Sequence, residues 1–200
     1  SGAYSRQLSS KFSVGLGLKY IYSNLAANQF VNGTQISAGT AVAGDLSATV
    51  KFPKKKNGLR KDFTLGISIT NIGSKISYTN SRNKDFLPTN LGIGTSYYFD
   101  IDQHNSLLLA LDFNKLLVPT PVASTLIDDQ GNLSPNPEYD ANHDTIPDWK
   151  QKGLLSSIVG SFSDAPGGFS EELKEFSYSL GAEYWYDKQF AVRAGYFHES

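Results

Sequence analysis

The acidic segment 140–148 has the residue types and the spacing that a hard cation needs. Oxygen ligands at alternate positions let a turn wrap around Ca²⁺. The candidate ligands, at positions one, three, five, seven and nine of such a loop, are Asp140, Asn142, Asp144, the Ile146 carbonyl and Asp148. Thr145 replaces the usual turn glycine, and Gln151 stands where a bidentate glutamate normally binds. We interpret the segment either as a Ca²⁺ site or as a solvated acidic loop.

Residue types that indicate catalysis are missing or scattered in the sequence. The chain has no cysteine, its three histidines (His104, His143 and His198) are far apart, and no G-x-S-x-G motif occurs. Glu171 and Glu172 could do acid–base chemistry, but a solvated loop helix or a partner contact explains them better. We expect no enzymatic activity and no cofactor other than the possible Ca²⁺.

An apolar stripe lies between the acidic segment and these glutamates. At helical spacing, one side of the predicted helix holds Leu154, Leu155, Ile158, Val159 and Phe162, and the opposite side holds Ser156, Ser157 and Ser161. Proline and glycine at 166–168 then end the helix. Such a stripe must be covered, so it predicts either a plug for the mouth of its own fold or a docking surface for another protein.

Composition narrows the class of protein that carries these loops. Among 200 residues, 18 Lys and Arg balance 19 Asp and Glu, and the net charge of −1 argues against a nucleic-acid partner. Charged residues make up 18% and aromatic residues 12%, which favours β-structure. No run approaches the roughly 18 apolar residues of a membrane-spanning helix. Any membrane role therefore needs a barrel.

Period-two alternation predicts the strands that position the loops. Seven runs alternate in this way, at 12–22, 42–52, 63–70, 90–99, 107–114, 176–186 and 190–197. One face of every run lacks Asp, Glu, Lys and Arg, whereas the other carries charges such as Lys19, Asp45 and Arg193. Aromatic residues stand at both ends of runs 12–22 and 176–186, with aliphatic residues between them. This order is typical of a strand that crosses a bilayer.

The predicted connections alternate between short and long. The short ones are 53–62, 100–106 and 187–189, and the long ones are 23–40, 73–88 and 118–173. Outer-membrane barrels have short periplasmic turns and long extracellular loops. We therefore predict an all-β, transmembrane, antiparallel up-and-down β-barrel, with a soluble β-sandwich as an alternative. A basic cluster falls on one periplasmic turn, near anionic headgroups: Lys54, Lys55, Lys56, Arg60 and Lys61.

Several strings resemble the PorV-type outer-membrane proteins of the type IX secretion system, which are similar to FadL-like barrels. The clearest is GSFSDAPGGFSEELKE at 160–175. Supporting strings are FLPTNLGIG at 86–94, LDFNKLLVPTP at 111–121, GAEYWY at 181–186 and RAGYF at 193–197. The resemblance runs along almost the whole chain.

This resemblance implies a barrel of about 14 strands, of which about seven lie in this chain. Residues 1–200 would then be one incomplete barrel domain that lacks its amino-terminal and carboxy-terminal strands. The implied role is a non-enzymatic carrier that docks at the translocon barrel, binds the C-terminal signal domain of exported cargo, and shuttles the cargo to the surface attachment and sortase complex. By position in the loop, the expected partner contacts are Phe162, Asp164, Phe169, Glu171 and Glu172.

A different function, transport of hydrophobic small molecules, is implied by the FadL-like relatives. It predicts a continuous apolar path through the barrel interior. The inward face is instead small and polar and carries charges such as Asp112 and Glu183, which argues against that path.

Overall fold

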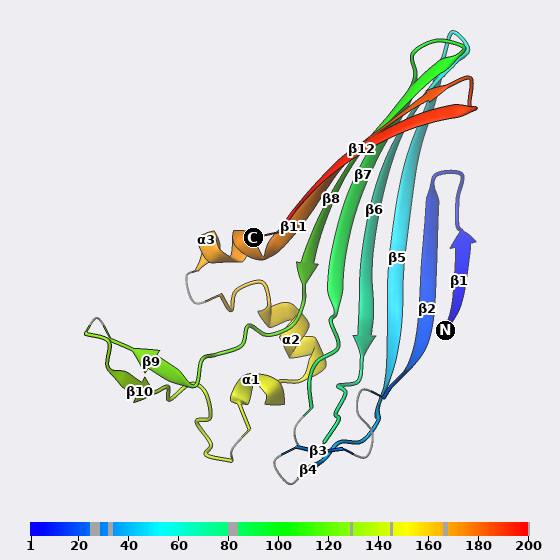
Figure 1. Cartoon of the computed structure of the whole chain (residues 1–200). Coiled ribbons are helices and arrows are strands. Elements are labelled where there is room, and N and C mark those ends of the chain that lie inside the picture. The colour runs from blue at the N-terminus through cyan, green and yellow to red at the C-terminus, as the bar shows by residue number, and fades with distance from the viewer. Residues whose placement is uncertain are drawn as a thin grey trace.

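The structure is a computed structural model that describes residues 1–24, 29–31, 34–79, 84–128, 130–144, 146–165 and 168–199. Its main feature is one eight-stranded antiparallel sheet (Figure 1). In spatial order the strands are β1 (Gly2–Gln7), β2 (Phe12–Ser23), β5 (Gly39–Lys56), β6 (Leu59–Gly73), β7 (Asn90–Asp100), β8 (Asn105–Leu116), β11 (Phe176–Tyr186) and β12 (Phe190–His198). Every strand pairs with its neighbour along the chain in this sheet, which makes an up-and-down meander.

All seven predicted runs are strands of this sheet, and β1 is an eighth strand that alternation did not predict. Its six residues include one large apolar side chain, Tyr4, so the alternation of apolar and polar residues cannot be recognised in this strand. Pairing with β2 places Tyr4 opposite Leu16 and Arg6 opposite Val14. Arg6 therefore lies on the apolar face, next to the turn that joins β1 to β2.

The registers confirm the two faces that alternation predicts. Apolar residues pair with apolar residues across successive strands, as Leu46 with Ile69 and Ile67 with Ile93. The apolar face is exposed along the sheet: Leu18 is 70% and Ile67 is 47% exposed. The described strands of the main sheet form a single layer, so no second sheet covers this face (Figure 1). The alternative of a β-sandwich with a sealed core is wrong.

On the polar face, glycines of one strand leave room for polar side chains of the next strand. A Cβ added at Gly17 would stand 2.9 Å from a carboxylate oxygen of Asp45. The same carboxylate pairs with Lys19 at 2.9 Å and accepts a hydrogen bond from the backbone N–H of Asn71 at 2.9 Å. Asn71 has a φ of 60° and lies near a register shift in the ladder of β5 and β6. Polar side chains thus lie flat over glycine on this face.

Short and long connections gather at opposite ends of the sheet (Figure 1). The short-turn end holds 8–11, 57–58, 101–104 and 187–189. Asn57 and Gly58 have φ values of 52° and 83°, which suit a tight hairpin turn. The long-loop end holds 24–38, 74–89 and 117–175. Two small hairpins lie in these loops, β3 (Phe30–Val31) with β4 (Thr34–Gln35) and β9 (Thr125–Ile127) with β10 (Leu133–Pro135). Loop 117–175 also contains the helices α1 (Asp148–Gln151), α2 (Leu154–Gly160) and α3 (Phe169–Glu172) and the 3₁₀ turn η1 (Leu173–Glu175).

Strand β5 is longer than β2 and projects beyond it at the short-turn end. The ladder between them begins at Phe12 opposite Val50, and the Lys51 N–H donates to Lys11 O at 2.8 Å. Beyond that point, residues 53–56 of β5 pair with β6 alone among the described strands. This stretch of edge holds Pro53 and three lysines.

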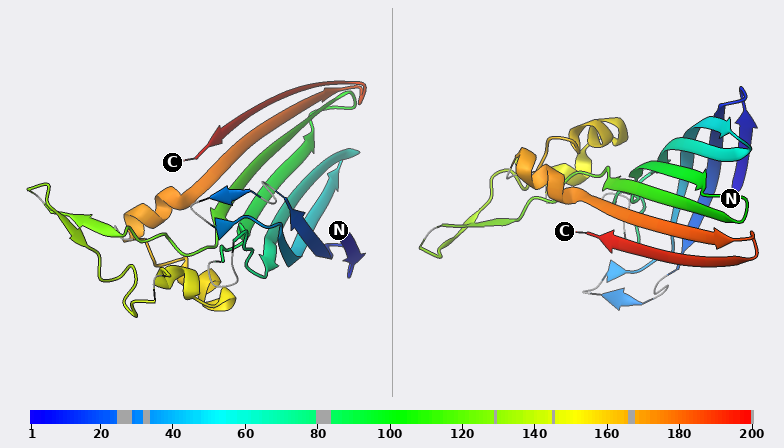
Figure 2. Two further views of the ribbon diagram at one scale, coloured as in Figure 1. Left: turned by 60° about the horizontal axis from the view of Figure 1, so that its bottom comes forward. Right: turned by 90° about the horizontal axis from the view of Figure 1, so that it is seen from above.

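The sheet is curved but not closed (Figure 2). In the described part of the chain, β1 and β12 pair on one side only and not with each other. The architecture is that of part of a β-barrel. A small core at the long-loop end packs Ala41 and Ala43 of the polar face against Ile76 and Leu87 of loop 74–89. None of the described helices is long and apolar enough to cross a membrane.

Candidate functional site

The loop 117–175 carries most of the residues that the sequence singles out. It leaves the sheet at the end of β8, runs through the β9–β10 hairpin and the helices, and returns into β11 (Figure 1). Leu117 and Ala165 are buried near its two ends, whereas every residue of the β9–β10 hairpin strands is exposed. The packed part of the loop is therefore the part next to β8 and β11.

A buried ion pair fixes both ends of this loop. The Lys115 side chain at the end of β8 is 0% exposed, and its ammonium lies 3.0 Å from a carboxylate oxygen of Glu172. Glu175 in η1 makes a second, shorter contact to the same ammonium. The rings of Phe176 and Phe162 lie 5.3 and 5.9 Å from Lys115 Nζ, measured to their centroids. We call Lys115, Glu172 and Glu175 the latch.

Further hydrogen bonds bring the two halves of the loop to the latch. The Ala165 N–H donates to the second oxygen of Glu172 at 2.9 Å. The Thr120 N–H donates to Asp164 at 3.1 Å, and the Thr120 hydroxyl lies 3.2 Å from a carboxylate oxygen of Asp164 and of Glu175. Burial alone raises the pKa of Glu172, but the hydrogen bond from Ala165 and the Lys115 ammonium outweigh it, and the pKa lies below its usual value.

Helix α2 presents its apolar residues outward. Leu155 and Val159 are 75% and 73% exposed, whereas Ser157 and Ser161 are 1% and 0% exposed. The buried hydroxyls are satisfied locally, because Ser157 Oγ donates to Gly153 O at 2.7 Å and Ser161 Oγ donates to Ile158 O at 2.9 Å. The prediction of an apolar side opposite the serines is confirmed in part, since Leu154 and Ile158 are half-buried. Leu155 and Val159 are exposed beside an open sheet, so the plug and the docking surface both stay predictions.

Two long loops are joined beside α2. Lys75 of loop 74–89 donates to the carbonyl oxygens of Lys150 and Lys152, at 2.5 and 2.7 Å, where α1 ends. Lys150 in turn pairs with Asp85 at 2.7 Å. A cation at the last carbonyls of a helix satisfies acceptors that have no partner within the helix. These contacts hold α1 against the neighbouring loop.

The predicted Ca²⁺ ligands accept hydrogen bonds from N–H groups of their own segment. Among the described residues, which leave out Thr145, no group of three or more acidic, histidine or cysteine side chains could hold a metal ion. The Asp144 N–H donates to Asp140 and Asn142 side-chain oxygens, both at 3.0 Å, and Asp148 accepts from the Ala141 N–H at 3.1 Å.

Gln151 contacts two of the predicted ligands, Asp144 and the Ile146 carbonyl. Its amide nitrogen lies 3.1 Å from both oxygens of Asp144 and 3.0 Å from Ile146 O. Among the described residues, these oxygens accept hydrogen bonds from a side-chain N–H₂ group and from backbone N–H groups. The two interpretations of the segment, as a Ca²⁺ site and as a solvated acidic loop, both stay predictions.

The predicted partner contacts lie near one another but differ in exposure. Phe162 is 48% exposed, and Glu171 is exposed at the surface of α3. Asp164 is half-buried, and Glu172 is buried in the latch, so both carboxylates are engaged within the chain. Phe169 begins α3, and its side chain lies outside the described part of the structure. A partner contact at each of these positions stays a prediction.

Lys115 is a site residue that the alternation pattern does not predict. It continues the outward row Leu109, Leu111 and Phe113 of β8 by two residues, which is a position where alternation expects an apolar side chain. A lysine in such an apolar row indicates that an acidic partner lies nearby. The structure shows that Glu172 and Glu175, which are three residues apart in the returning loop, are these partners.

An antiparallel meander with one exposed apolar face and a latched loop at one end defines a partial β-barrel protein with a candidate docking surface. The family described as type IX secretion system protein PorV matches residues 1–123. Because the match spans more than half of the 200 residues, the chain belongs to the PorV family and is a type IX secretion system protein. No curated protein matches the chain. The relation to FadL-like barrels stays a prediction.

Proposed function

We propose that this chain is part of a non-enzymatic outer-membrane barrel of the type IX secretion system. In this proposal the apolar face contacts lipid, the short turns lie in the periplasm, and the long loops lie outside the cell. The barrel docks at the translocon, binds the C-terminal signal domain of exported cargo, and carries it to the surface attachment complex. Family membership supports the secretion role, and the exposed apolar face supports a bilayer setting.

The observation that carries the docking step is the outward stripe of α2. Leu155 and Val159 have the i, i+4 spacing by which an amphipathic helix enters a groove on another protein, and Phe162 is exposed just after the helix ends. Helix α2 buries two serines and exposes large apolar side chains, and such exposed apolar side chains are typical of a surface that a partner covers. The latch supports this function, because it holds the helix in place before the partner arrives.

A substitution in α2 tests the proposal better than a deletion of the loop. A deletion that removes Glu172 and Glu175 would leave Lys115 without its partners. The variant is Val159→Glu, and the matched control is Ser156→Glu, which adds the same charge at another exposed position of the helix. Each full-length protein is purified in detergent from outer membranes together with whatever remains bound. We expect Val159→Glu to lose most of the translocon and the cargo signal domains, and Ser156→Glu to retain them. Equal recovery with both variants would refute docking through α2.

Transport of hydrophobic small molecules gains no support from the polar face. A hollow of about 420 Å³ on that face is lined by polar side chains that include Ser47, Ser68, Asp112 and Asn114. An apolar solute would leave these groups without hydrogen-bond partners. The carrier function is therefore the better proposal.

A further inference from the structure

Lysines continue the apolar face of β5 and β6 past its last aromatic pair. Phe52 and Phe63 face each other across the ladder, with ring centroids 6.0 Å apart. Two residues further toward the short turn, Lys54 stands directly opposite Lys61. Because side chains alternate along a strand, these two lysines share the face of the Phe52 and Phe63 rings. Lys56 follows on the same face, and all three lysines are exposed.

Both faces of this hairpin carry opposed cations, because Lys55 stands opposite Arg60 on the inward face. On the inward face, Arg60 lies 2.5 Å from Asp62 and its backbone N–H donates to Asp100 at 2.7 Å. On the outward face, the ion pairs of the described residues include neither Lys54 nor Lys61. Like charges directly opposite each other on a sheet are destabilising. The outward pair therefore favours an anion between the two ammonium groups.

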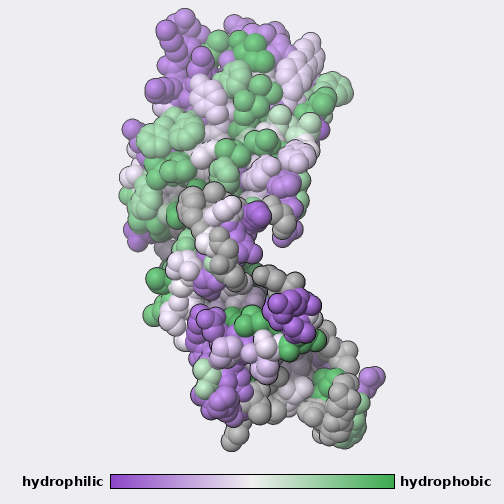
Figure 3. Space-filling model, turned by 90° about the vertical axis from the view of Figure 1, so that its left-hand side faces the viewer, coloured by the Kyte–Doolittle hydropathy of each residue, from purple (hydrophilic) through white to green (hydrophobic). Residues whose placement is uncertain are grey.

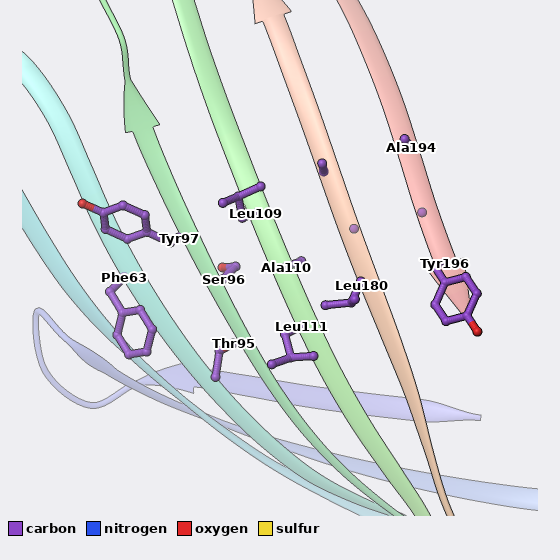
Figure 4. A pocket seen from close by; sticks show the side chains of 13 residues that line it. Phe63, Thr95, Ser96, Tyr97, Leu109, Ala110, Leu111, Leu180, Ala194 and Tyr196 are labelled. Carbon is purple, nitrogen blue, oxygen red and sulfur yellow. The ribbon is translucent and has the colours of Figure 1, made fainter. Parts of the chain in front are cut away.

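An apolar hollow on the outward face begins at Phe63, two residues along β6 from Lys61. It has a volume of about 580 Å³ and crosses the outward face from Phe63 of β6 to β12 (Figure 4). Leu109 lies in its middle, and the small side chains Ala182 and Ala194, which are paired across β11 and β12, leave it open. Figure 3 shows the wider setting, with hydrophobic side chains gathered over the strands and hydrophilic ones at the short-turn tip.

We propose that this face binds an anionic phospholipid, with its phosphate between Lys54 and Lys61 and an acyl chain in the hollow that starts at Phe63. The inference rests on the bilayer setting of the proposed function. In that setting the aromatic pair lies at the headgroup level, and lysines beyond it extend their ammonium groups to phosphate. A zwitterionic lipid brings no net charge, so the site selects lipids with a net negative charge.

Native mass spectrometry of the full-length protein in detergent tests this proposal. The probes are dioleoyl phosphatidylglycerol, which is anionic, and dioleoyl phosphatidylcholine, which is zwitterionic and has the same chains. The variants are Lys54→Gln and Lys61→Gln. The matched control is Lys55→Gln, which removes the same charge from the inward face of the hairpin. A fourth variant, Ala194→Phe, fills the hollow and keeps all charges.

We expect more phosphatidylglycerol than phosphatidylcholine on the parent protein, and a loss of about fivefold for each outward lysine removed. Lys55→Gln should retain the lipid, and Ala194→Phe should weaken binding of both lipids. Equal binding by Lys54→Gln and Lys55→Gln would overturn the proposal. Displacement of the lipid by millimolar inorganic phosphate would also overturn it, because the site would then need no acyl chain.

Membrane insertion and translocon recovery are measured on the same variants, which separates the two proposals. A chain that inserts and recovers the translocon but shows no lysine-dependent lipid binding contradicts this inference alone. A chain that does not insert into membranes contradicts the proposed function as well.

Discussion

Lys115 stands at the point where the long loop leaves the sheet, and its partners stand where the loop returns. Its ammonium is fully buried between Glu172 and Glu175. Taking a cation out of water is costly unless opposite charge and hydrogen bonds replace the lost hydration. Both are present here, since Glu172 also accepts from the Ala165 N–H. The position of the loop therefore depends on a few charged groups rather than on a large apolar core.

Removal of the cation should open the loop and leave the strands in place. In Lys115→Gln, the buried carboxylate of Glu172 loses its counter-ion, and breaking such a pair costs about 3 to 5 kcal/mol. We expect faster proteolysis within 117–175 and unchanged protection of β5 to β7. The control Lys174→Gln removes an exposed lysine next to Glu175. A loop as resistant in Lys115→Gln as in the parent would show that the latch does not hold it.

The latch should also respond to acid in a defined range. The folded pKa of Glu172 is lower than its usual value of 4.5. A group with a depressed pKa contributes stability above its unfolded pKa and loses that contribution as pH falls through the folded pKa. We expect the protection of the loop amides against hydrogen exchange, relative to the unfolded chain at the same pH, to be constant from pH 8 to about pH 5 and to fall only below about pH 4.5. Glu172→Gln should lose this acid response. Loosening of the parent loop near pH 6 would contradict the assignment.

At the scale of elements, period-two patterns predicted strands well because alternation is a local property of the chain. All seven runs fall in strands, and Leu16, Leu46 and Ile69 meet on one face as their alternation requires. The side of α2 that is buried could not be predicted in the same way. Which side of a seven-residue helix is covered depends on what packs against it, and serine hydroxyls can bond to carbonyls of their own helix.

Adjacent residues of β6 give a matched test of the two faces. Ile67 is on the apolar face between Ala48 and Ile93, and Ser68 lines the polar hollow. In the proposed bilayer setting, Ile67→Lys should cost about 2 to 4 kcal/mol of the free energy of unfolding. Ser68→Lys should cost much less, because its ammonium stays in a polar space. Urea unfolding of both variants in lipid vesicles measures the difference, and equal costs would argue against lipid contact on the Ile67 face.

At the scale of the whole molecule, the sequence predicted the meander, the two ends and the exposed apolar face. It did not predict how the loops fold on one another, because contacts such as Lys75 with the end of α1 join residues that are far apart in sequence. The acidic segment shows a related limit. Its spacing matches most of a Ca²⁺ loop, and Gln151 contacts two of the predicted ligands, so spacing alone does not decide between a Ca²⁺ site and a solvated loop.

The part of β5 that projects beyond β2 protects the chain from unwanted self-association. In an antiparallel ladder, successive N–H groups on one side come from every second residue, so Pro53 follows Lys51 on the free side. Proline has no N–H to offer there, and neighbouring lysines repel a second copy. Before the sheet meets its final neighbours, this ribbon is therefore a poor template for fibrils or for strand exchange between chains.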